Sequence, residues 1–143
     1  MTTQREQVLD RLITVLAGTS NVGTRIYRSR AVALQRAETP ALVVEWSTDT
    51  PDRTTSARVL DWVLSVSISV VCRGDKPDEI ADPIIESLHS KIMSDTTLNG
   101  YAFDIETGAQ SLQLVDADQP AGVVECVYLV RYRTLETDLT QAP

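Results

Sequence analysis

Residues 60–72 read LDWVLSVSISVVC, and their alternation of apolar and polar side chains decides the fold. Every even position is apolar, from Leu60 to Cys72, whereas the odd positions include Asp61 and serines. A period of two places successive side chains on opposite faces of a sheet, so this segment predicts a strand with one apolar and one polar face. Fully extended, it would measure ~43 Å, against a diameter of ~37 Å for a compact chain of this length. We therefore expect a strand that bends or projects from the domain.

An amphipathic helix is predicted near the N-terminus. Thr3 and Glu6 have the spacing of a capping box, and apolar residues recur at helical spacing from Val8 to Leu16. Gly18 then ends the run.

Further strands are predicted on both sides of the long one. Short extended pieces are expected at residues 25–27 and 31–34, and a clear strand follows Pro40 at residues 41–46. Turn formers and hydroxyl side chains fill residues 47–56, which predicts a loop. Later strands are expected at residues 101–105, 111–115 and 123–133. The last has Val127 and Leu129 on its second face as well, which is typical of a central or interface strand.

A second helix is predicted after the turn at residues 74–77, with Pro77 in its first turn. Its expected buried stripe is Ile80, Ala81, Ile84, Ile85, Leu88, Ile92 and Met93. The elements together predict an α+β fold, with a mostly antiparallel or mixed sheet of four to six strands and two amphipathic helices packed on one face. We expect one domain over residues 1–143, with Trp46 and Trp62 in its core.

The composition favours a folded, acidic protein. Hydrophobic residues make up 43% and charged residues 23%, close to a globular average. The net charge of −7 disfavours binding to nucleic-acid phosphates and anionic membranes through bulk charge. We expect no secretion signal and no membrane-spanning segment, and therefore a cytosolic protein. Cys72 and Cys126 lie in apolar stretches and are interpreted as reduced core thiols.

Candidate chemical motifs are few. The sole histidine, His89, has no nucleophile motif beside it and is interpreted as structural. Glu79, Asp82 and Glu86 share a helix face but lack the spacing of a metal site, which favours a solvated face. Six dispersed glycines match no phosphate-binding loop. We expect no catalytic, cofactor-binding or metal-ligating residue and no enzyme activity.

Basic side chains gather in one part of the acidic chain. All but two of the 13 basic residues are arginines, the exceptions being Lys76 and Lys91. Four of them fall between residues 25 and 36: Arg25, Arg28, Arg30 and Arg36. Pairing with the acidic surface of another subunit, a solvated loop, and binding to nucleic acid all remain open.

The order of these patterns resembles a known family. The residues that carry the resemblance are Arg25-Ile26-Tyr27-Arg28, Thr39-Pro40-Ala41-Leu42-Val43-Val44, the long alternating strand, a helix with Asp78, Ala81 and Asp82, and a terminal Tyr132-Arg133-Thr134. Nearly the whole chain is similar in this way to the tail-terminator (minor tail, tail-completion) proteins of long-tailed bacteriophages.

The resemblance implies a structural virion protein and no cofactor. Copies would form a homo-hexameric ring that caps the tail tube, ends its polymerisation and provides the surface for head joining. Partners would be the tail-tube protein and a head-completion or connector protein, with no membrane and no direct sequence-specific nucleic acid. The protein would belong to the virion tail, assembled in the cytoplasm of the bacterial host.

Candidate interface residues follow from charge and expected position: Arg28, Arg30, Asp49, Asp52, Arg53, Arg131 and Arg133. Three alternatives remain: another head-tail joining protein, a tail-tube component, or a small ligand-binding domain or enzyme.

Overall fold

A computed structural model describes residues 2–28, 39–53, 58–115 and 120–143. It contains two α-helices, one short 3-10 helix and five strands. In chain order these are α1 (Gln4–Leu16), β1 (Ile26–Arg28), β2 (Ala41–Asp52), β3 (Val59–Arg73), α2 (Pro77–Met93), η2 (Leu98–Gly100), β4 (Asp104–Val115) and β5 (Ala121–Leu135). The α+β class expected from the sequence is confirmed.

The five strands form one mixed sheet in the order β1-β2-β3-β5-β4. Only β1 runs parallel to its neighbour, and the pairs β2–β3, β3–β5 and β5–β4 are antiparallel. The expected long strand is confirmed as β3, which pairs along its whole length with β5. Because β5 lies between β3 and β4, its prediction as a central strand is also confirmed.

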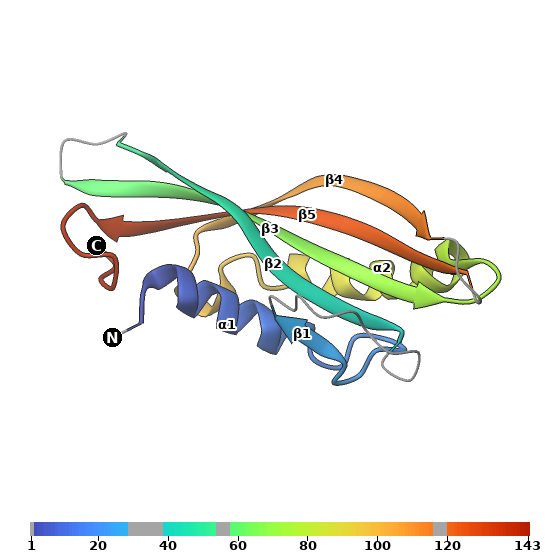
Figure 1. The fold of residues 1–143 in the computed structure, drawn as a ribbon. Coiled ribbons are helices and arrows are strands. Elements are labelled where there is room, and N and C mark those ends of the chain that lie inside the picture. The colour runs from blue at the N-terminus through green and yellow to red at the C-terminus, as the bar shows by residue number, and fades with distance from the viewer. Residues whose placement is uncertain (1, 29–38, 54–57, 116–119) are drawn as a thin grey trace.

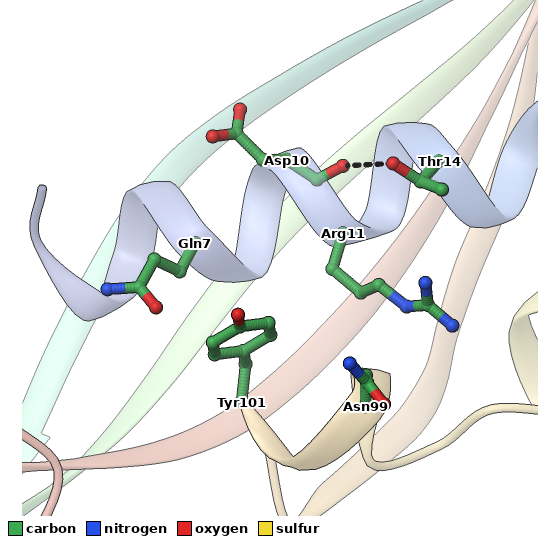
Figure 2. A pocket seen from close by; sticks show the side chains of 6 residues that line it. All are labelled: Gln7, Asp10, Arg11, Thr14, Asn99 and Tyr101. Carbon is green, nitrogen blue, oxygen red and sulfur yellow. Dashed lines mark hydrogen bonds between the residues drawn. The ribbon is translucent and has the colours of Figure 1, made fainter.

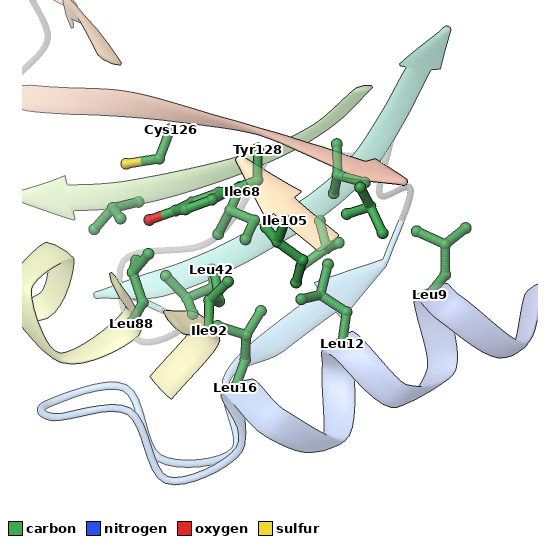
Figure 3. Close-up of a cluster of buried hydrophobic side chains, with 14 of the residues drawn as sticks. Leu9, Leu12, Leu16, Leu42, Ile68, Leu88, Ile92, Ile105, Cys126 and Tyr128 are labelled. Carbon is green, nitrogen blue, oxygen red and sulfur yellow. The ribbon is translucent and has the colours of Figure 1, made fainter. Parts of the chain in front are cut away.

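Both α-helices cover the same face of the sheet, as Figure 1 shows. Leu9, Leu12 and Leu16 point from α1 toward the strands, where Ile68 and Tyr128 meet them (Figure 3). These five side chains are at most 1% exposed. The alternation of β3 therefore places its apolar residues in the core, as its period of two requires.

Local sequence explains where α1 begins and ends. The Thr3 hydroxyl oxygen accepts a hydrogen bond from the Glu6 backbone N–H at 3.2 Å, the cap expected from the sequence. The Glu6 carboxylate accepts a bond from Arg28 at 2.6 Å, which ties the first turn of α1 to β1. Gly18 follows the helix with a φ of +82°, a left-handed conformation that suits glycine.

The second helix is as predicted except at its end. Ala81, Ile84, Leu88 and Ile92 are buried, but Met93 is 38% exposed, so its place in the buried stripe was wrong. Met93 is the last residue of α2 and lies at the margin of the stripe, where its sulfur is 4.0 Å from the Thr107 hydroxyl of β4.

Strand β2 is longer than the sequence indicated. Residues 47–52 were predicted as part of a loop, but they continue β2 and pair with residues 61–65 of β3, beyond a bulge between Trp46 and Thr48. The prediction was wrong there because cross-strand pairing to β3 offsets the weak strand preference of these polar residues. Trp46, expected in the core, is 39% exposed because it lies in this distal part. Figure 1 shows β2 and β3 continuing past the start of α1.

The two strands predicted near residues 101–115 form one strand. β4 runs unbroken from Asp104, with a bulge between Thr107 and Gln110 that accommodates Gly108. Residues 101–103 lie outside it, after η2, so the predicted strand start was wrong. The predicted strand at 31–34 lies outside the described residues.

The C-terminal residues 136–143 return to the start of α1. The Gln4 backbone N–H donates to the Leu139 carbonyl oxygen at 2.9 Å, and the Gln4 side-chain amide donates to the Thr140 carbonyl oxygen at 2.9 Å. Both chain ends consequently lie at the same end of the molecule (Figure 1).

Candidate assembly surfaces

The sheet has one face that no described element covers, and we call this the open face. It carries the odd-numbered side chains of β3 and β5, opposite the helices. Its centre is formed by half-buried small and apolar side chains: Val63, Ser65, Ser67, Ser69 and Val71 on β3, and Val123, Val127 and Leu129 on β5. Two exposed carboxylates interrupt it, Glu45 opposite Ser67 and Glu125 opposite Ser69. A contiguous surface of this composition suits contact with another protein.

At one end the open face has a small apolar cluster of its own. Ala41 and Val43 of β2 are at most 8% exposed, and Tyr27 and Val71 pack against them. Val43 lies between β1 and β3, which pair with β2 on either side of it and shield its side chain. The open face is thus apolar near β1 and more polar along the serines.

Arg28, a predicted interface residue, is engaged within the chain. Its guanidinium donates to Glu6 at 2.6 Å and to Asp10 at 3.2 Å, both on α1. The hydrogen bond from Arg28 lowers the pKa of the Glu6 carboxyl, and its partner in turn raises the pKa of Arg28. This pair fastens β1 to α1.

Asp49 lies on the helix-covered side of β2, with a side chain only 4% exposed. Its carboxylate accepts a hydrogen bond from the Tyr132 hydroxyl and lies 3.5 Å from Arg5 Nη1. Burial raises the pKa of the Asp49 carboxyl, although Tyr132 and Arg5 both act to lower it. Asp49 therefore joins three elements inside the subunit and offers little surface to a neighbour.

Sequence reasoning missed the partners of Asp49. Arg5 also stacks over the Trp46 ring at 4.3 Å, and Trp62 Nε1 donates to the Thr134 hydroxyl at 2.9 Å. The cluster links the distal β2–β3 hairpin to α1 and β5. No local motif identifies it, because its members are far apart in the sequence.

Two predicted residues, Arg131 and Arg133, lie on the open face of β5. Arg131 donates to Glu106 at 3.0 Å, and Arg133 donates to Asp61 at 2.6 Å while stacking over the Phe103 ring at 4.4 Å. These cross-strand pairs place alternating charges at one end of the open face.

The remaining predicted residues are at or near the distal end of β2. Asp52 is exposed and opposite Asp61, and Arg53 lies 3.6 Å from the Glu136 carboxylate. Arg30 lies outside the described residues. The interface role of the whole set stays a prediction. The structure brings Asp52, Arg53, Arg131 and Arg133 toward one end of the sheet, where Asp49 lies on the helix-covered face.

The hollows in the surface are shallow and polar. Figure 2 shows one of about 270 Å³ between α1 and η2, lined by Gln7, Asp10, Arg11, Thr14, Asn99 and Tyr101. In it Thr14 donates to the Asp10 carbonyl, and Arg11 pairs with Asp95 at 3.1 Å. A larger hollow of about 520 Å³ adjoins the start of α2 and is open to solvent. Neither one assembles a nucleophile with a general base.

Burial favours the neutral forms of two thiols and one phenol in the core. Burial raises the pKa of both Cys72 and Cys126 to about 11, so both remain thiols near neutral pH. His89 Nδ1 lies 2.8 Å from the Tyr128 hydroxyl, and burial raises the pKa of Tyr128 to about 12. The described ranges contain no group of three or more His, Cys, Asp or Glu side chains suited to a metal ion.

No protein-family model matches the sequence, and no curated protein matches it. Among the helices that the structure describes, none has the length and apolar character needed to cross a membrane.

Proposed function

We propose that this chain is a structural subunit that assembles with copies of itself into a ring of the kind that caps the tail tube of long-tailed bacteriophages. The observation that carries the proposal is the open face, a five-stranded sheet surface whose half-buried centre of small and apolar side chains no described element covers. Such a surface is retained in soluble proteins mainly where a partner covers it. The order of sequence patterns supplies the link to tail terminators.

The ring follows from a repeated contact between different surfaces. If the open face of one copy contacts another part of the next, the same rotation applies at every step, and the assembly closes into a ring when that rotation divides a full turn without a rise along the axis. A closed ring seated on a tube offers no further copy of the tube's own stacking surface, so tube growth ends there. Its other side is then available for head joining.

The distal parts of β2 and β3 form a projecting arm that can contact a neighbouring subunit or the tube. They extend past α1, carry the exposed residues Thr48, Thr50 and Asp52, and are fixed to the body by the cluster around Asp49. A rigid arm reaches a neighbour without the entropy loss of ordering a loose loop. We assign it contact with the adjoining subunit or with the tube.

A matched pair of substitutions tests the role of the open face. In Ser67→Lys a charged side chain stands at the centre of that face, whereas in Ser90→Lys the same change falls on an exposed position of α2. We expect the wild type and Ser90→Lys to form rings in native mass spectrometry and negative-stain images, and Ser67→Lys to remain smaller. A wild type that stays monomeric at every concentration, or rings that persist in Ser67→Lys, contradict the proposal.

A further inference from the structure

We infer that the outer edge of β4 pairs with the same edge of a second copy, in an antiparallel, two-fold contact centred on Gln113. This contact is separate from the ring proposed above, because a two-fold contact is satisfied by two copies and cannot propagate.

The first observation is an unprotected edge. β4 is the last strand of the sheet, and within the described ranges no strand pairs with its outer side. Its residues 107–115 contain no charged residue and no proline. On its helix-covered side Leu112 is 49% exposed and Leu114 is 64% exposed, the highest values among the described large hydrophobic residues. Free backbone groups beside exposed leucines are a template for another strand.

The opposite edge of the sheet is protected by contrast. Beyond the three residues of β1, residues 45–52 of β2 form that edge. They include Glu45, Asp52, Pro51, which has no backbone N–H, and a bulge after Trp46. Charges, proline and bulges are the features by which edge strands avoid pairing. β4 also has a bulge, between Thr107 and Gln110, and charges at Asp104 and Glu106, but these precede residues 111–115, which form the unprotected part of that edge.

The sequence of β4 is complementary to itself. With Gln113 at the two-fold axis, Leu112 lies opposite Leu114 of the partner subunit, and the same pair recurs on the other side of the axis. The four leucines then form one apolar cluster beside the helices, while Gln113 faces Gln113 of the partner subunit on the open-face side. Asp104 and Glu106 fall outside the paired segment, so no like charges meet.

A cysteine at the axis tests this register directly. Opposed residues of an antiparallel pair have Cα atoms about 4.5 to 5.5 Å apart, within the span of a disulfide. We expect Gln113→Cys to give a covalent dimer under mild oxidation, lost on adding dithiothreitol. The matched control is Ser90→Cys, an exposed position on α2, which should remain largely monomeric on a non-reducing gel. The native Cys72 and Cys126 are buried and stay in both variants.

A second substitution separates pairing from random collision. Adding Leu114→Lys to Gln113→Cys should abolish the covalent dimer, because two ammonium groups would then face the partner's Leu112 across the axis. Leu114 is mostly exposed, so an unchanged melting temperature should accompany the loss. Equal cross-linking of Gln113→Cys and Ser90→Cys, or cross-linking that survives Leu114→Lys, overturns the inference. Rings in native mass spectra without any cross-link at position 113 overturn it too, while leaving the proposed function standing.

Discussion

The two faces of β3 differ in burial and in what covers them. Its helix-covered face carries four aliphatic side chains with no exposed surface: Leu64, Val66, Ile68 and Val70. The open face alternates with them and carries half-buried serines at 65, 67 and 69, with no described element above. Burial on the first face stabilises the subunit, whereas small side chains on the second leave a flat surface for contact. The difference predicts that stability and assembly respond to different residues of the same strand.

The largest expected effect is at Ile68. Ile68→Ala should lower the free energy of unfolding by about 3 kcal/mol, since it removes buried carbon and leaves a cavity under the helices. Ser67→Ala, one residue away on the open face, should change it by less than about 0.5 kcal/mol. Urea denaturation of both variants measures the contrast. Similar losses of unfolding free energy in Ile68→Ala and Ser67→Ala would contradict the proposed difference between the two faces.

The next effect is at Gly122, on the helix-covered side of β5. A Cβ atom there would lie 2.6 Å from the Pro77 Cβ atom at the start of α2. Gly122→Ala should therefore cost about 2 kcal/mol of unfolding free energy through overpacking. Ser67→Thr also adds a methyl group, but on the open face, and should leave the thermal unfolding midpoint nearly unchanged. If Gly122→Ala left the free energy of unfolding unchanged, α2 would be able to move away from β5 more easily than its packing indicates.

A smaller, pH-dependent effect is expected at Asp49. Because burial raises the pKa of this carboxyl, its ionisation costs stability as the pH rises through that value. Asp49→Asn keeps an acceptor for Tyr132 but cannot ionise. The variant should thus gain stability relative to wild type between acidic and neutral pH, as measured by urea denaturation across that range. A constant difference would show that the Asp49 carboxyl has an ordinary pKa.

The smallest effect is at Glu6, and its sign is opposite. Arg28 lowers the pKa of this carboxyl, so the pair contributes stability above the ordinary pKa of glutamate and loses it as the pH falls through the lowered value. Both partners are substantially exposed, so Glu6→Gln should cost at most about 1 kcal/mol at neutral pH. The cost should shrink in acid, and also in high salt. If the loss of unfolding free energy in Glu6→Gln persisted in acid, it would come from the helix cap and not from the ion pair with Arg28.

Much of the fold follows from periodicity, and the exceptions are informative. β3, α1 and α2 were predictable because their apolar residues repeat at the period of the element. Residues 47–52 were not, since only pairing with β3 makes a strand of a polar, turn-rich segment. Trp46 was misplaced for the same reason: a strand position indicates a face, but not whether a helix reaches far enough to cover it.

The candidate surfaces were less predictable than the fold. Charge identified Arg28, Arg131 and Arg133, but not that each has an acidic partner in the same chain. The alternation predicted a polar face on β3, but alternation alone permits either solvent or a partner on that face. The exposure of the β4 leucines could not be predicted from the sequence. An apolar residue in a strand is expected to be buried, and the sequence does not show that β4 lies at the edge of the sheet.

The contact between Gln4 and residues 139–140 has a practical consequence. It holds both ends of the chain at one end of the subunit. In any assembly built by rotation about an axis, every copy places a given point at the same height along that axis. A gold-binding tag on either end would consequently mark one height along the ring axis, so side views of a ring bound to a tube would reveal whether that end of the subunit faces the tube.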